Sequence, residues 1–130
     1  MKLKHVATLT LAGLALAGCQ NRTAASAPSS KVPEAKVVGE AVSCLHRNDY
    51  RETRVRDDRT IDFIGSGGRA WRNTLPYTCS GLGFNEAFGY STSISQLCST
   101  DIIWVIEQGS EARRGASCGL GKFVPVELPK

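Results

Sequence analysis

Thr60-Ile61-Asp62-Phe63-Ile64-Gly65-Ser66-Gly67-Gly68-Arg69-Ala70-Trp71-Arg72-Asn73-Thr74-Leu75 is the stretch that decides the predicted fold. Side chains alternate between the faces of a strand, so Ile61 and Phe63 share one face, and Trp71, Asn73 and Leu75 share one side of the next strand. Glycines adopt positive φ without a steric cost, and residues 65–68 therefore predict a hairpin loop. Pro76 ends the second strand, since it has no N–H to donate.

Weaker patterns on both sides predict further short strands. Residues 37–45 suit a strand or a short helix, 52–56 alternate before an Asp-rich turn, and 79–88 form a glycine-rich loop with one helical turn near 85–87. Alternation over 88–95 predicts a strand with one buried face, and the apolar run 102–106 predicts a central strand covered on both sides. Residues 109–115 predict a charged loop, and 123–128 a last strand that Pro125 places at an edge. The predicted fold is mainly β, a small antiparallel sandwich or a partly open barrel of about five or six strands.

The N-terminal segment has the pattern of a targeting signal. Lys2 and Lys4 precede an uncharged, mostly apolar run over 6–17, which has signal-peptide length and is too short to span a bilayer. Leu16-Ala17-Gly18-Cys19 resembles the lipobox of bacterial lipoproteins. The resemblance implies that the Cys19 sulfur receives a diacylglyceryl group, that the chain is cut before Cys19, and that the new amine is acylated.

These features divide the chain into a signal peptide over 1–18, a lipidated Cys19 with a flexible tether over 19–41, and a small domain over 42–130. The tether is predicted from its Ala, Ser, Pro and Thr content. Gln20 stands where an Asp tends to retain such lipoproteins in the inner membrane, so the chain resembles the class sorted to the outer membrane. We expect the acyl chains to hold the domain at the periplasmic face of that membrane.

The cysteine count fits an oxidising compartment. A domain of about 90 residues has a marginal core, and small secreted domains commonly depend on disulfides. If lipid occupies Cys19, the four cysteines left are Cys44, Cys79, Cys98 and Cys118. They predict two disulfides, and spacing alone leaves all three connectivities open.

Charge argues against a nucleic-acid partner. The formal charge of +4 includes Lys2 and Lys4, which leave with the signal peptide. In the domain the signs interleave, with Arg54, Arg56 and Arg59 close to acidic residues, and no basic stripe of the kind that neutralises phosphates appears.

Several motifs together resemble an uncharacterised family of small proteobacterial envelope proteins, a domain of unknown function. The motifs are Asp57-Asp58-Arg59-Thr60-Ile61, Trp71-Arg72-Asn73-Thr74-Leu75, Cys79 with Gly81-Leu82, Leu97-Cys98 and Cys118-Gly119-Leu120-Gly121. Related proteins keep only the equivalents of Cys79 and Cys118. The resemblance therefore implies that these two pair and that Cys44 pairs with Cys98. It brings no activity and no catalytic residue.

No catalytic constellation stands out in the sequence. In the predicted mature chain His46 is the one histidine, and it is expected to be a solvent-facing loop residue rather than a general base. Asp57, Asp58 and Asp62 suggest a carboxylate pair, but turn aspartates more simply bond backbone amides and pair with Arg56 or Arg59. With the thiols expected in disulfides, we predict no metal site, no cofactor and no enzymatic activity.

One surface residue is a candidate for recognition. Most aromatic residues are needed for the core, whereas Trp71 lies close to Arg69 and Arg72, and these three residues form the candidate recognition set. The leading hypothesis is a non-enzymatic, lipid-anchored periplasmic module that binds another envelope protein or a cell-wall component. The alternatives are an inhibitor of a lysozyme-type wall hydrolase, presenting loop 65–72 or 109–115, and a weak hydrolase using Asp57, Asp58 or Asp62.

Overall fold

A computed structural model describes residues 32–130 as an antiparallel β structure. The predicted signal peptide, Cys19 and most of the predicted tether lie outside the described residues. Strand makes up 44% and helix 4% of the structure. The elements are β1 (Lys36–Val37), β2 (Cys44–His46), β3 (Glu52–Val55), β4 (Thr60–Ile64), β5 (Ala70–Thr74), α1 (Leu82–Asn85), β6 (Phe88–Tyr90), β7 (Gln96–Cys98), β8 (Ile102–Glu107), β9 (Arg113–Gly119) and β10 (Phe123–Glu127).

The predicted hairpin forms the centre of the largest sheet. This sheet has the order β1-β10-β5-β4-β3, and every neighbouring pair is antiparallel. In the β4–β5 hairpin Phe63 lies opposite Trp71, and Ile64 lies opposite Ala70. Gly67 and Gly68 have φ of 66° and 77°, the left-handed values that the loop prediction requires.

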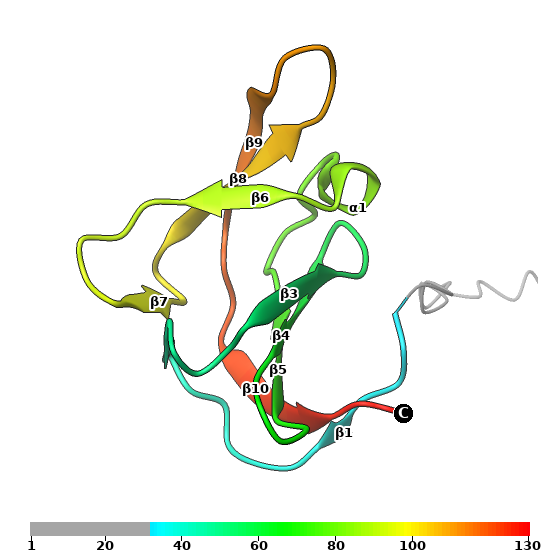
Figure 1. Cartoon of the computed structure of the whole chain (residues 1–130), viewed down its shortest axis with the longest axis vertical. Coiled ribbons are helices and arrows are strands. Elements are labelled where there is room, and N and C mark those ends of the chain that lie inside the picture. Colours follow the sequence, from blue (N-terminus) through cyan, green and yellow to red (C-terminus); the bar gives the residue numbers. More distant parts are fainter. Residues whose placement is uncertain (1–31) are drawn as a thin grey trace, which may run out of the picture.

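Two smaller sheets complete the fold. Strands β2 and β7 pair with each other, and β8 lies between β6 and β9 (Figure 1). The sheets do not close into a barrel, and the predicted class of a mainly β, antiparallel, disulfide-bonded fold is confirmed. The strands described are more numerous than predicted, because several span only two or three residues.

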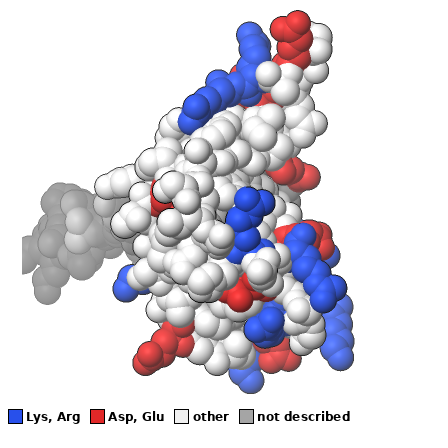
Figure 2. Space-filling model, turned by 60° about the vertical axis from the view of Figure 1, so that its left-hand side comes forward, with Lys and Arg blue, Asp and Glu red and all other residues white. Residues whose placement is uncertain are grey.

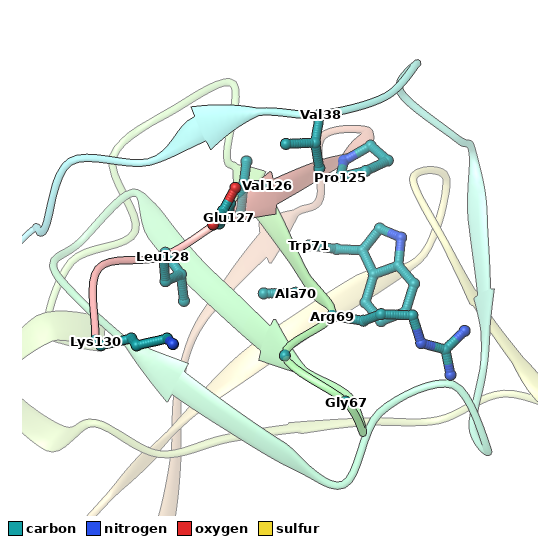
Figure 3. A pocket seen from close by; sticks show the side chains of 11 residues that line it. Val38, Gly67, Arg69, Ala70, Trp71, Pro125, Val126, Glu127, Leu128 and Lys130 are labelled. Carbon is teal, nitrogen blue, oxygen red and sulfur yellow. The ribbon is translucent and has the colours of Figure 1, made fainter.

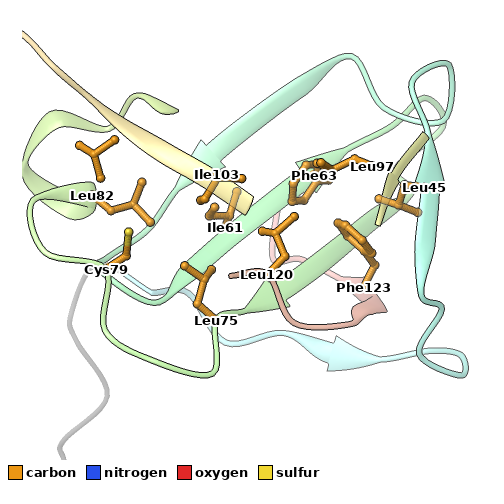
Figure 4. Packing of buried hydrophobic residues seen from close by; sticks show 11 residues of the cluster. Leu45, Ile61, Phe63, Leu75, Cys79, Leu82, Leu97, Ile103, Leu120 and Phe123 are labelled. Atoms are coloured by element: carbon orange, nitrogen blue, oxygen red, sulfur yellow. The ribbon is translucent and has the colours of Figure 1, made fainter. Parts of the chain in front are cut away.

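The core lies where the three sheets meet (Figure 4). Phe63 and Phe123 come from the large sheet and pack edge to face, with ring centroids 5.2 Å apart. The β2–β7 pair contributes Leu45 and Leu97, and Ile103 comes from β8. Since each sheet supplies fully or nearly fully buried side chains, no sheet has a core of its own.

The two disulfides join segments that are far apart in the sequence. Cys44 and Cys98 lie directly opposite each other in the β2–β7 pair, and their bond joins the two strands. Cys79 is bonded to Cys118, which ties the segment before α1 to β9. The pairing that the family resemblance implies is therefore confirmed.

The prediction for residues 88–95 is too long. Strand β6 ends at Tyr90, because only residues 88–90 pair with β8, and Ile94 is 58% exposed. The predicted loop 109–115 is likewise too long, since β9 begins at Arg113 and pairs with β8. The first error arose because the alternating residues after Tyr90 are mostly serines and threonines, which do not form a buried face. The second arose because β9 has few apolar residues, so its sequence does not predict a strand.

Two predictions about strand position are also corrected. Strand β10 is not an edge strand, since β1 pairs along its outer side. Just beyond β1, the Val38 N–H donates to the carbonyl oxygen of Pro125. Pro125 has no N–H to donate in return, but this position is at the end of the short β1–β10 ladder, so the pairing is not interrupted. Strand β8 is central, as predicted, but only one side is fully covered: Ile103 and Val105 are buried while Ile102 is 52% exposed.

The folded part begins within the stretch assigned to the tether. Strand β1 lies at 36–37, and Val42 makes an isolated bridge with Phe123. Within residues 32–130, no helix has the length and apolar character needed to cross a membrane.

Candidate functional site

One surface hollow lies where β5 begins and β10 ends, and we call it the end groove (Figure 3). The last residue pair between the two strands is Ala70 with Val126, and beyond it the two strands no longer pair. The cavity volume is about 590 Å³, which lies within the range of ligand sites. The end groove is lined by Val38, Gly67, Gly68, Arg69, Ala70, Trp71, Pro125, Val126, Glu127, Leu128 and Lys130.

Arg69 and Trp71 of the candidate recognition set both line the end groove. Trp71 is half-buried and packs against the core, and the Arg69 guanidinium lies 5.6 Å from its ring centroid. Arg69 Nε also donates to the carbonyl oxygen of Ser66 at 3.4 Å. The exposed cation is thus held beside an aromatic ring whose polarised face attracts it.

Arg72 does not join them. Its Nε and Nη2 donate to the two carboxylate oxygens of Asp62 at 2.8 and 2.9 Å, and its Nη1 donates to the carbonyl oxygen of Pro33 at 2.9 Å. Adjacent residues of a strand point to opposite faces, so Trp71 faces the core side and Arg72 the other. Arg72 therefore holds residue 33 against the sheet, and three of its five N–H donors are engaged within the chain.

The rim of the end groove carries charges. Glu127 and Lys130 are exposed like Arg69, and within residues 32–130 none of the three is in an ion pair. The floor is apolar and includes Ala70 and Val126, which are 5% and 3% exposed. An apolar floor with unpaired charges at its rim is suited to binding.

The three candidate carboxylates do not converge on one cleft. Asp57 Oδ1 accepts from the Arg59 amide, and Asp58 Oδ1 accepts from the Gly83 amide at 2.7 Å. Asp62 is fully buried, and Arg56 Nε donates to it at 2.8 Å in addition to Arg72. Each carboxylate is thus engaged by groups of its own chain. Asp57 and Asp58 bond backbone amides as expected, whereas Arg56 pairs with Asp62 rather than with the turn.

His46 lies on β2 rather than in a loop. It is exposed, and its Nε2 lies 3.2 Å from Gln96 Nε2 on the paired strand. No group of three or more His, Cys, Asp or Glu side chains within residues 32–130 could hold a metal ion.

One perturbed titratable group lies away from the end groove. The hydroxyls of Tyr50 and Tyr90 are 2.9 Å apart and join the chain before β3 to β6. Burial and the hydrogen bond with Tyr90 raise the pKa of Tyr50. Tyr50 is therefore neutral at physiological pH, and its hydroxyl links the two segments through the contact with Tyr90.

The face of the molecule in Figure 2 carries charges of both signs. Figure 2 shows Lys and Arg interspersed with Asp and Glu on this face, with charges also gathered at the top, on the β8–β9 hairpin. Uncharged surface separates the two groups of charges.

Sequence reasoning found Arg69 and Trp71 but missed Val38 and Leu128. These residues lie beside the groove because strand pairing brings the two ends of the domain together, and no sequence pattern marks that. Neither a protein-family model, nor a curated protein, nor a solved structure matches this chain.

Proposed function

We propose that this chain is a non-catalytic, lipid-anchored module of the bacterial cell envelope, held at the periplasmic face of the outer membrane, that binds an envelope partner through the end groove. The observation that carries the binding role is the cavity of about 590 Å³ lined by Arg69 and Trp71. The lipobox-like stretch ending at Cys19 supports the anchor, and the two disulfides suit an oxidising compartment.

Capture from crosslinked envelopes tests the binding role. We expect the intact tagged lipoprotein to yield a crosslinked product that Val38→Glu removes, because this change places a charge in the apolar lining. Val38 is 55% exposed, so the fold should tolerate the change. Val42→Glu is the matched control, since Val42 lies on the same segment and does not line the groove. Absence of a product above background, or a product insensitive to Val38→Glu, would reject a groove-dependent function.

A second candidate, inhibition of a wall hydrolase, is favoured by the β8–β9 hairpin. This hairpin projects from the body of the molecule (Figure 1), and Glu111, Arg113 and Arg114 on it are exposed. A projecting charged loop suits insertion into a partner's cleft. The test adds the full chain to lysozyme-type enzymes of several classes. We expect the full chain to slow at least one class of these enzymes, and we expect Glu111→Ala and Arg113→Ala to weaken this inhibition. Unchanged rates in every class would reject this candidate.

A weak carboxylate hydrolase gains no support from the geometry. Glycoside hydrolysis needs two acids facing one cleft about 5 to 9 Å apart. Asp62 is buried between two guanidinium groups, while Asp57 and Asp58 accept from amides.

A further inference from the structure

The loop over residues 76–86, which we call the aromatic loop, presents two large apolar side chains to solvent. Phe84 is 89% exposed and Tyr77 is 82% exposed, the highest values among the large hydrophobic residues of the described chain. Single exposed apolar residues are common. The setting of these two is less common, since the loop that carries them is held rigidly.

Contacts at both ends and in the middle fix the aromatic loop. Cys79 is bonded to Cys118, and the Cys79 amide donates to the carbonyl oxygen of Asp58 at 2.8 Å. The Asp58 carboxylate accepts from the Gly83 amide, and Asn85 Oδ1 accepts from the Gln108 amide at 3.0 Å. A side chain presented by such a loop loses little backbone freedom on binding, which favours its use as a binding anchor.

A repeated motif shows that the exposure of Phe84 is not imposed by the local sequence. Cys79-Ser80-Gly81-Leu82-Gly83-Phe84 and Cys118-Gly119-Leu120-Gly121-Lys122-Phe123 both begin with cysteine and end with phenylalanine five residues later, and each contains Gly-Leu-Gly, shifted by one residue between the two. Both leucines are buried, and both second glycines donate their amides to a side-chain oxygen, of Asp58 and of Asn73. Phe123 is fully buried in the core, whereas Phe84 points outward.

The aromatic loop and the end groove carry opposite charge. Asp57 packs with its backbone against Gly83, Asp58 bonds Gly83, and Glu86 is exposed two residues after Phe84. The Arg59 guanidinium donates to the carbonyl oxygens of Leu75 and Pro76 at the start of this loop. Arg54 and Arg56 line a hollow with Glu86, but they form ion pairs with Glu52 and Asp62, so the remaining carboxylates are in excess.

The end groove has the reverse balance. Among its lining residues Arg69 and Lys130 are the cations, and Glu127 is the one carboxylate side chain. We propose that the partner of the end groove is a second copy of this chain, whose Phe84 enters the apolar cavity while Asp57 and Glu86 face Arg69 and Lys130.

The two surfaces lie at different ends of the molecule. In Figure 1, α1 lies in the upper half, while β1 and the end of β10 lie at the bottom. A copy therefore cannot fill its own groove, and the contact is heterologous and joins copies head to tail. The inference deepens the proposed function and rests on it. The contact is small, so confinement of anchored copies to one membrane surface must raise their effective concentration.

Photo-crosslinking between two complementary full-length chains tests the contact in producing cells. The first chain carries Val38→Glu, which blocks its groove, and p-benzoylphenylalanine in place of Phe84. The second carries Phe84→Ser and a different tag, so it offers an intact groove and no anchor. We expect a crosslink between the two chains that maps to groove-lining peptides of the second. Adding Val38→Glu to the second chain should reduce it at least about tenfold, and Val42→Glu should leave it unchanged.

The outcomes separate this inference from the proposed function. Self-association through the end groove is overturned if no crosslink forms between the chains, or if the crosslink is unchanged when the second chain carries Val38→Glu. If envelope capture still gives a product that Val38→Glu removes, the groove binds a different partner and the proposed function stands. Migration of each variant on non-reducing gels, with both disulfides intact, verifies that the changes do not act through misfolding.

Discussion

Asp62 shows at the residue scale how a short motif sets local stability. Its carboxylate is fully buried and bonded by Arg56 and Arg72, whose side chains are 19% and 14% exposed. We predict that Asp62→Asn lowers the free energy of unfolding by about 3 to 5 kcal/mol, because two poorly solvated guanidinium groups lose their counter-charge. Urea unfolding measures the loss. Glu52→Gln, at an exposed ion pair, is the control and should cost much less, because solvent screens that pair. Equal costs would mean that Asp62 is better solvated than the structure indicates.

Tyr50 gives the fold a pH dependence at the alkaline end. Its pKa lies above the ordinary value of 10.0 in the folded protein, because burial and the hydrogen bond with Tyr90 favour the neutral phenol. A group with a raised pKa contributes stability below its unfolded pKa and loses it as pH rises further. We therefore predict that the free energy of unfolding falls as the pH rises above 10, and that it falls less steeply in the Tyr50→Phe variant. Urea unfolding at pH 8 and pH 11 tests this. Parallel pH profiles for both proteins would contradict the assignment.

The β2–β7 pair is the element that depends most on a crosslink. Each strand has three residues, and within residues 32–130 each pairs only with the other. We predict that Cys44→Ala with Cys98→Ala costs about 2 to 4 kcal/mol, since the bond closes a sequence separation of 54 residues. Hydrogen exchange should accelerate at 44–46 and 96–98 and remain slow in β4 and β5. Removing Cys79 and Cys118 together is the comparison, and it should accelerate exchange in the aromatic loop instead. Uniform acceleration in both variants would show that neither bond acts locally.

Sequence reasoning succeeded for elements whose signal is local. The β4–β5 hairpin combines alternation with a glycine-rich loop, and its strands lie within one residue of the predicted bounds. It failed for β9, whose arginines, glycines and serine have low strand preference and which forms because it pairs with β8 and is tied through Cys118. The end groove was predictable only through Arg69 and Trp71, because its other walls are brought in by pairing between distant segments.

At the scale of the whole molecule, three small sheets share one core, so no part of the domain is expected to fold alone. Phe63, Leu97 and Ile103 come from three different sheets and share one core only when all three sheets have docked. The exposed ends are then fixed relative to one another by this shared core.

The last prediction concerns the mature protein as a whole and begins with Cys19. The lipobox-like stretch implies cleavage after Gly18, which leaves 112 of the 130 residues. We predict that the non-reduced mature protein has the mass of this chain with its acyl chains and with four fewer hydrogens, because Cys44, Cys79, Cys98 and Cys118 are all oxidised. Intact mass spectrometry without reduction measures cleavage, acylation and oxidation together. Cys19→Ser is the control, and it should move the protein out of the membrane fraction, since the signal-peptide run is too short to span a bilayer. An uncleaved and fully reduced native product would place the protein in a reducing compartment. Both the lipid anchor and the binding of an envelope partner would then be rejected.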